Sequence, residues 1–192
     1  MTTPTTYVKR LASTARQQYD KFRFLRENEP PLSTQIAQYW TAGVGDRFPG
    51  VDIPWSAVFV SWCVKTAGAT KQQFRFAAAH SQFVHQAIKN AGEASAVFVG
   101  RALADYVPKI GDILQNNRGG NRFDFTHASK HSSYASHSAI VVEVGVDSKG
   151  RYLRTIGGNE GDTVALKEVR LDNQGRVRNP IGLYISAIET RL

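Results

Sequence analysis

The sequence predicts an α+β domain in which helices precede an antiparallel sheet. The first part of the chain contains segments whose apolar residues recur at helical spacing. From residue 110 onward, short segments rich in β-branched residues alternate with turn-forming residues. The chain has 192 residues, of which 42% are hydrophobic, enough for one domain with a buried core. Helices followed by strands are typical of the α+β class.

The first two helices are expected in residues 5–27 and 33–40. In the first range Arg and Lys fill one face, and the apolar side chains that recur every three or four residues are Val8, Leu11, Ala12, Ala15, Tyr19 and Phe22. Two consecutive prolines end this helix, because the residue before a proline disfavours helical backbone. A loop rich in Gly, Pro and Asp follows at residues 43–54.

Two more helices are expected before the strands. The helix that begins near Ser56 is apolar on most of its circumference, which places it in the core, and Gly68 suits its end. A further helix is expected over residues 80–91, with Gly92 beyond its end.

The remaining chain is expected to form an antiparallel meander. Residues 147–150 (Asp-Ser-Lys-Gly) form the turn of a hairpin, and the polar segment 116–136 is long enough to be a loop beside a site. The expected strands are 110–115, 138–146, 151–158, 163–171 and 181–188.

The charge balance favours an anionic partner. Lys and Arg total 24 against 16 Asp and Glu, a net charge of +8, which suits nucleic acid, an anionic membrane or an anionic wall polymer. The basic residues are scattered and form no nucleic-acid-binding signature, so nucleic acid is not expected as a partner. No apolar run is long enough to span a membrane. The first 20 residues lack the apolar core of a Sec signal peptide, so the protein is expected to be made in the cytoplasm.

Ser56 is a candidate nucleophile because it begins the buried helix. Free backbone N–H groups and the positive dipole end of a helix N-terminus stabilise a developing anion. An ordinary capping or first-turn serine is the alternative. Cys63 lies two turns further along this helix and is expected to be a buried structural thiol. As the single cysteine, it excludes an internal disulfide.

His137 and Asn159 are the candidate partners of Ser56. The hairpin through residues 147–150 places them at the same end, since one residue begins its first strand and the other follows its second. An amide oxygen of Asn159 there accepts from one ring nitrogen of His137 and directs the other nitrogen toward Ser56. The alternatives are a solvated loop histidine and a turn asparagine.

A metal centre is not expected. His127, His131 and His137 lie within eleven residues, but in a serine-rich loop rather than on one helix face, with Asp124 the nearby carboxylate. No cofactor is expected either. His80 begins a helix, where it either caps that helix or lines the cleft.

Five motifs, in order, resemble those of bacterial papain-like cell-wall hydrolases of the CHAP and NlpC types. PWSAVFVSWCVKTAG (54–68) resembles the PWCAAFVSWCLKQAG motif of these enzymes, and YVPKIGDIL (106–114) resembles their P-x-x-G-D segment. HSAIVVEV (137–144) is similar to their histidine strand and IGGNEGDTV (156–164) to the segment of their third residue. An uncharacterised bacterial family with PWSAAFISW, SASHS, P-x-x-G-D, H-x-x-IVV and GGN motifs is more similar still, and AAAHSQFV (77–84) matches its second motif.

The resemblance, over roughly residues 45–185, implies a papain-like fold with a core catalytic helix packed on an antiparallel sheet. A helical extension, residues 1–44, would pack on a hydrolase domain, residues 45–192. The implied catalytic residues are Ser56, His137 and Asn159, with Trp55 and His80 as substrate-binding residues. Because the cysteine enzymes have their nucleophile where this chain has Ser56, three accounts stay open: a native serine nucleophile, a site that lost catalysis and kept binding, or an engineered substitution. A native serine is favoured by the more similar family.

The function expected from the resemblance is hydrolysis of amide bonds in peptidoglycan stem peptides, by an amidase or an endopeptidase. Without a Sec signal, the protein would reach the wall as a phage lysis factor or as an antibacterial effector of a secretion system, paired with an immunity protein. A wall- or protein-binding module on the same fold is the first alternative. A serine esterase or acyltransferase is the second.

Overall fold

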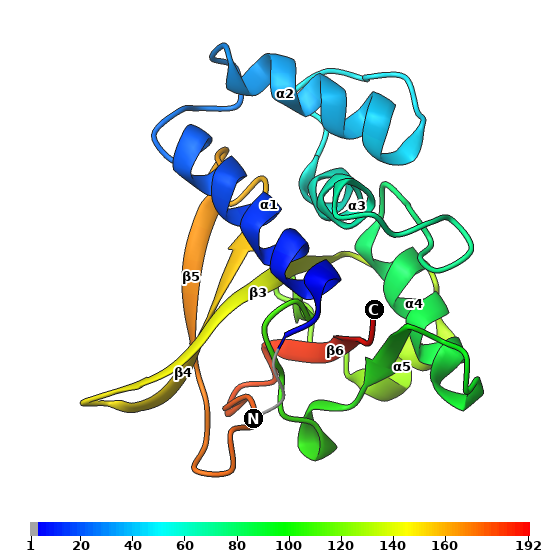
Figure 1. Ribbon diagram of the computed structural model, residues 1–192, viewed down its shortest axis with the longest axis vertical. Coiled ribbons are helices and arrows are strands. Elements are labelled where there is room, and N and C mark those ends of the chain that lie inside the picture. Colours follow the sequence, from blue (N-terminus) through cyan, green and yellow to red (C-terminus); the bar gives the residue numbers. More distant parts are fainter. Residues whose placement is uncertain (1–3) are drawn as a thin grey trace.

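A computed structural model describes residues 4–192, whose strands form one six-stranded sheet (Figure 1). The strand order is β1-β6-β2-β3-β4-β5, and each neighbouring pair is antiparallel, so the α+β class is confirmed. The strands are β1 (Phe98–Arg101), β2 (Ile113–Asn117), β3 (Ser136–Asp147), β4 (Gly150–Gly157), β5 (Ala165–Arg170) and β6 (Tyr184–Thr190).

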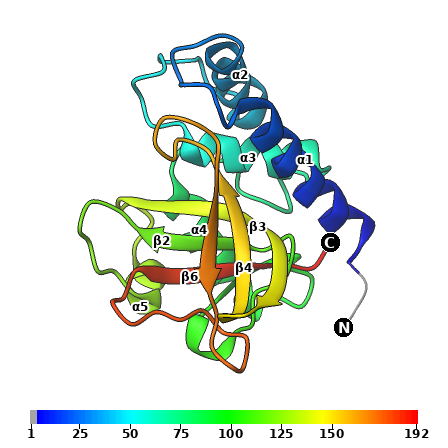
Figure 2. The same ribbon diagram turned by 90° about the vertical axis from the view of Figure 1, so that its left-hand side faces the viewer.

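The main helices lie on one side of this sheet. Figure 2 shows α4 behind the strands and α3 above them; α3 contacts β3, and α4 contacts β1 and β6. The longer helices are α1 (Thr6–Phe22), α2 (Leu32–Gln38), α3 (Ser56–Thr66) and α4 (His80–Lys89), and a short α5 (Phe125–Lys130) precedes β3. A π-helical segment, Tyr39–Val44, continues α2, and short 3-10 turns cover Asn90–Gly92 and Leu103–Asp105.

Successive strand residues belong to two different cores, because side chains alternate between the faces of a sheet. Ile113 and Ile140 pack into the larger core with the helices. Their neighbours Leu114 and Val141 pack into a smaller core on the opposite face. Leu11 of α1 lies in the larger core, so the helical extension expected in residues 1–44 packs into the same core as the rest of the chain.

Four elements differ from the sequence predictions. The last strand does not extend the meander: β6 lies between β1 and β2. Strand β1 is so short that it was not expected, and α5 occupies part of the segment expected to be a loop. Helix α1 ends at Phe22 rather than near residue 27, because the chain turns there to meet the loop after β4. At this junction the Thr163 hydroxyl donates to the Phe22 carbonyl at 2.9 Å.

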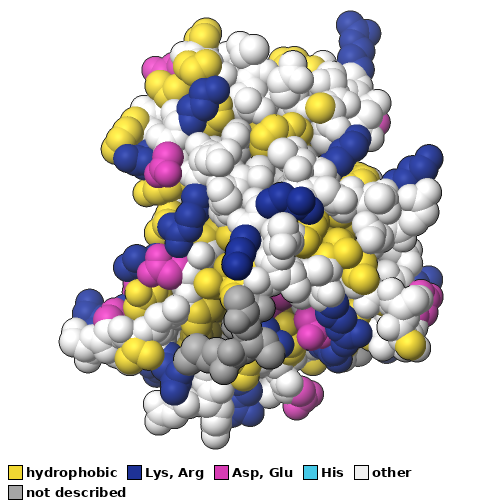
Figure 3. All heavy atoms as spheres, in the orientation of Figure 1, with side chains coloured by type: hydrophobic (Ala, Val, Ile, Leu, Met, Phe, Trp, Pro, Cys, Tyr) yellow, Lys and Arg dark blue, Asp and Glu magenta, His cyan; other side chains and the backbone are white. Residues whose placement is uncertain are grey.

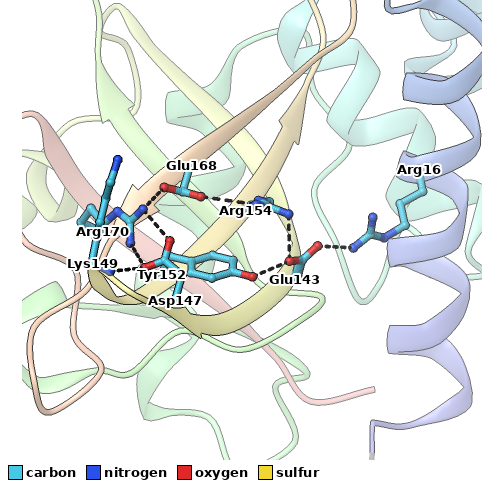
Figure 4. A network of polar contacts seen from close by, with 8 residues as sticks. All are labelled: Arg16, Glu143, Asp147, Lys149, Tyr152, Arg154, Glu168 and Arg170. Carbon is cyan, nitrogen blue, oxygen red and sulfur yellow. Dashed lines mark hydrogen bonds and ion pairs between the residues drawn. The ribbon is translucent and has the colours of Figure 1, made fainter.

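Polar contacts also fasten α1 to the sheet (Figure 4). Arg16 donates to the Val142 carbonyl at 3.0 Å and to Glu143 at 3.2 Å. Glu143 in turn accepts from the Tyr152 hydroxyl at 2.9 Å and from Arg154 at 3.1 Å. Because these side chains are partly exposed, each ion pair contributes at most about 1 kcal/mol, and the apolar contacts of α1 dominate its docking.

The surface agrees with the net charge of the sequence. Figure 3 shows Lys and Arg side chains distributed over the face that carries α1, with Asp and Glu more sparsely placed. Exposed basic side chains include Lys9 and Arg10 of α1 and Lys65 of α3. Within residues 4–192, no helix is long and apolar enough to cross a membrane.

Candidate active site

Ser56 is the first residue of α3, an 11-residue helix that runs through the larger core. Trp55 precedes it at the capping position, and no side chain of the described residues forms a capping hydrogen bond with the first turn. The Ser56 side chain therefore lies among backbone N–H groups at the positive end of the helix dipole. The residue is 2% exposed, so these dipoles act on its hydroxyl in a largely water-free environment.

The hydroxyl of Ser56 is hydrogen-bonded to His80 and not, as expected, to His137. Ser56 Oγ lies 2.7 Å from His80 Nε2, and His80 is the first residue of α4. The β/extended backbone of Ala79 directs the chain into α4 so that its first side chain faces the start of α3. The sequence could not predict this contact, because it depends on how α3 and α4 each pack against β3.

His80 is 5% exposed, and its surroundings oppose a positive charge on the ring. Burial lowers its pKa well below the ordinary 6.5, and the charges of His137 and Arg118 lower it further. Within the part of the chain that the structure describes, its Nδ1 atom has no hydrogen-bond partner. His80 was expected to bind substrate; the structure makes it the direct neighbour of the candidate nucleophile.

His137 lies beside His80 and is paired with a carboxylate. Its Nε2 atom is 2.9 Å from Glu160 Oε1, and the centroids of the two imidazole rings are 5.2 Å apart. Glu160 also forms an ion pair with Lys167. Burial alone would raise the pKa of Glu160, but the contacts with His137 and Lys167 hold it below its ordinary value. Ser56, His80, His137 and Glu160 thus form one contiguous polar cluster inside the larger core.

Asn159 does not have the expected contact with His137. Its side-chain amide donates to Glu27 Oε2 at 3.2 Å, and the adjacent Glu160 takes the place beside His137. The reason is local backbone geometry, since Asn159 has φ of 55°, a left-handed conformation that asparagine tolerates better than most residues. Gly157 lets the His137 ring approach, because a Cβ atom there would lie 2.9 Å from His137 Nε2.

Trp55 is a core residue rather than an exposed substrate contact. It is fully buried, its indole N–H donates to Glu27 Oε2 at 2.8 Å, and its ring stacks on Tyr39. Gly158 packs against the indole, where a Cβ atom would come within 2.5 Å of Trp55 Cζ3. Trp55 therefore supports the helix start that carries Ser56 but offers no surface to a ligand.

The other candidate residues lie apart from this cluster. His127 stacks on Phe123 and on His131, with ring centroids 3.9 and 4.2 Å apart. Among residues 4–192, no three His, Cys, Asp or Glu side chains are grouped as metal ligands would be. Cys63 is fully buried, as predicted, and burial raises the pKa of its thiol well above the ordinary value.

Comparison of the chain with models of protein families identifies one family. Residues 33–188 match the model of the family described as "Uncharacterized protein conserved in bacteria (DUF2272)". The chain belongs to this family. The region matched to the DUF2272 family includes Ser56, His80, His137 and Glu160 and begins after Glu27. No curated protein and no solved structure matches the chain.

Two site residues of this DUF2272 protein escaped the sequence analysis. Glu160 directly follows Asn159 in the GGN-containing motif, so a carboxylate one residue from a candidate is the signal that could have identified it. Glu27 left no such signal: it is 28 residues from Trp55 and 132 from Asn159, and only the docking of the segment after α1 brings the three together.

Proposed function

We propose that this protein is a serine hydrolase that cleaves amide bonds in peptidoglycan stem peptides, on a papain-like variant of the α+β fold. The observation that carries the proposal is the position of Ser56: it begins a core helix, its hydroxyl contacts an imidazole at 2.7 Å, and a histidine–carboxylate pair lies next to that imidazole. Nucleophile, base and orienting carboxylate are the components that acyl transfer requires.

His137 is the proton acceptor in this proposal. A base that becomes positively charged needs a nearby negative charge, and Glu160 supplies one at 2.9 Å. Among residues 4–192, no carboxylate contacts His80, and its burial opposes a positive charge. Glu160 thus assumes the orienting role that the sequence assigned to Asn159.

The reaction follows from these roles. The hydroxyl proton of Ser56 moves to His137 while Oγ forms a bond to the carbonyl carbon of the amide, whose π electrons pass to oxygen. Backbone N–H groups at the start of α3 stabilise this oxyanion. Collapse breaks the C–N bond, and His137 returns the proton to the leaving amine. Water, deprotonated by His137, then hydrolyses the ester on Ser56 and restores the free enzyme.

Three features support peptidoglycan as the substrate. The ordered motifs of the chain resemble those of cell-wall hydrolases, and helices before an antiparallel sheet are compatible with the fold of those enzymes. The net charge of +8 favours binding to an anionic wall.

A wall-binding module is the second candidate function. The observations that favour it are the serine in place of a cysteine nucleophile and the near-complete burial of Ser56 and His80, which are 2% and 5% exposed. A serine hydroxyl is a much weaker nucleophile than a thiolate unless its base is aligned. If His137 does not accept the hydroxyl proton, the protein would therefore bind the cell wall without cleaving it.

Release of soluble muropeptides from purified sacculi tests the proposal. Wild-type protein is expected to release them, His137→Ala to lose this activity, and Ser56→Cys to retain or increase it. Binding to sacculi without release by wild type, with activity gained only in Ser56→Cys, would establish the binding module instead. Cleavage of small esters with no action on sacculi would overturn the peptidoglycan assignment and leave an esterase.

A further inference from the structure

We propose that His80 serves catalysis as a neutral hydrogen-bond donor that holds Ser56 Oγ through Nε2–H, and that it is not the base of the reaction. The inference rests on the proposed function, because it assigns a role within the same site. Beyond that proposal, the two adjacent imidazoles have different roles: His80 donates a hydrogen bond, and His137 accepts and returns the proton.

The hydrogen bonds of the His80 ring determine its tautomer. A neutral imidazole carries one proton, on either Nδ1 or Nε2. A proton on Nδ1 would leave a buried N–H donor without an acceptor, since that atom has no partner among the described residues. A proton on Nε2 is instead placed in the 2.7 Å contact with Ser56 Oγ. Buried N–H groups without acceptors are rarer than buried acceptors without donors, so the Nε2–H tautomer is favoured once the Ser56 hydroxyl proton is directed to His137, as the proposed mechanism requires.

The direction of this hydrogen bond has a consequence for Ser56. When Oγ accepts from His80, the serine's own proton is free to be directed to a different acceptor. The imidazole next to His80 is His137, whose Nε2 atom is occupied by Glu160, and in the proposed mechanism its Nδ1 atom receives that proton. The two histidines of the cluster then have different roles, because His80 stabilises the oxygen and His137 takes the hydrogen.

The donated hydrogen bond acts most strongly while charge develops. As the hydroxyl proton passes to His137, negative charge grows on Oγ and then on the carbonyl oxygen one bond beyond the attacked carbon. A fixed N–H donor in a buried site stabilises such charge without having to reorganise. His80 keeps its own proton throughout, so no additional proton acceptor is needed.

Nitrogen-15 NMR of the wild-type protein tests the tautomer directly and needs no substrate. Long-range correlations between ring carbon-bound protons and nitrogens identify which nitrogen of His80 carries the proton. The expected result is a protonated Nε2 and a bare Nδ1 between about pH 5 and 8, the range in which an unperturbed histidine titrates. A proton on Nδ1, or a doubly protonated ring within that range, would overturn the inference.

Kinetics on sacculi supply the second readout. His80→Gln keeps an N–H donor near the position of Nε2 but cannot act as a base, whereas His80→Ala removes both functions. The inference predicts that His80→Gln retains activity within about tenfold of wild type with an unchanged acid limb of the pH profile, and that His80→Ala loses about 10²–10³-fold. Equal, near-complete losses in both variants, with both folded by circular dichroism, would show that His80 is the base. His131→Gln is the matched control, since His131 is exposed and stacked on His127 away from the cluster.

The two measurements separate failure of this inference from failure of the proposed function. A protein that releases no muropeptides but carries its His80 proton on Nε2 loses the hydrolase proposal and keeps the assigned hydrogen bond. A protein that cleaves sacculi with its His80 proton on Nδ1 keeps the proposed function and refutes the donor role.

Discussion

Asn159 donates a 3.2 Å hydrogen bond to Glu27, 132 residues earlier in the chain. The same carboxylate oxygen accepts the indole N–H of Trp55 at 2.8 Å. Trp55 directly precedes Ser56, and Asn159 directly precedes Glu160. One side chain from the segment after α1 therefore fixes the neighbours of both the candidate nucleophile and the candidate orienting carboxylate.

Removing the Glu27 carboxylate is expected to lower both the stability of the protein and the rate of muropeptide release. Glu27→Ala leaves the indole N–H of the fully buried Trp55 without its acceptor, which should lower the free energy of unfolding by about 1–3 kcal/mol. Chemical denaturation measures this loss. Glu93→Ala, at an exposed glutamate, is the matched control and should change stability by less than about 0.5 kcal/mol. Equal stabilities of the two variants would mean that Glu27 does not hold the site together.

Glu160 is expected to matter through its negative charge. Glu160→Gln keeps an oxygen for the hydrogen bond to His137 but no longer favours a protonated ring, so muropeptide release should fall by about 10²–10⁴-fold. Glu168→Gln, on strand β5, is the control and should leave muropeptide release unchanged. Unchanged release by Glu160→Gln would remove Glu160 from the mechanism.

Asp112 is expected to make stability fall as the pH rises. Burial raises its pKa from 3.8 to about 6, although hydrogen bonds from Thr190, Lys109 and Tyr106 oppose the shift. Between these two values the native state binds more protons than the unfolded state, so this group's contribution to stability is full below about pH 4 and is lost through pH 6, about 3 kcal/mol in all.

Denaturation of wild type and Asp112→Asn across this pH range measures that contribution. The asparagine does not titrate, so any advantage of the wild type over the variant should shrink between pH 4 and 7. An advantage that grows with pH would show that the Asp112 carboxylate is stabilised in the charged form. Asp105→Asn, at an exposed aspartate, is the control.

The parts of the fold that follow from local pattern were predictable. Helix α3 and the β3–β4 hairpin depend on apolar periodicity and on a four-residue turn, and both lie where the sequence placed them. The position of β6 between β1 and β2 was not predictable, because it pairs residues far apart in the chain and no local signal specifies the partner.

The candidate site also has predictable and unpredictable parts. Ser56, His80 and His137 were all identified from motifs, but the hydrogen bonds expected from Ser56 and from Asn159 to His137 are replaced by bonds to His80 and to Glu27. The structure pairs Ser56 with His80 because α3 and α4 both pack against β3, and it turns Asn159 away through its left-handed backbone. Residue identity can be read from a motif, but a hydrogen-bond partner depends on side-chain direction, which only the assembled core determines.

The most direct test of the central claim is whether Ser56 Oγ forms a covalent bond to the phosphorus of a phosphonylating reagent, with loss of fluoride. Wild-type protein is treated with a fluorophosphonate and analysed by intact-protein and peptide mass spectrometry. The account predicts one adduct per chain, located on Ser56, absent in Ser56→Ala and strongly slowed in His137→Ala. Ser56→Ala should remain folded but lose about 1–3 kcal/mol of stability, because it leaves the buried Nε2–H of His80 without its acceptor. No adduct on wild type, or equal labelling of wild type and Ser56→Ala, would contradict the assignment of Ser56 as a nucleophile.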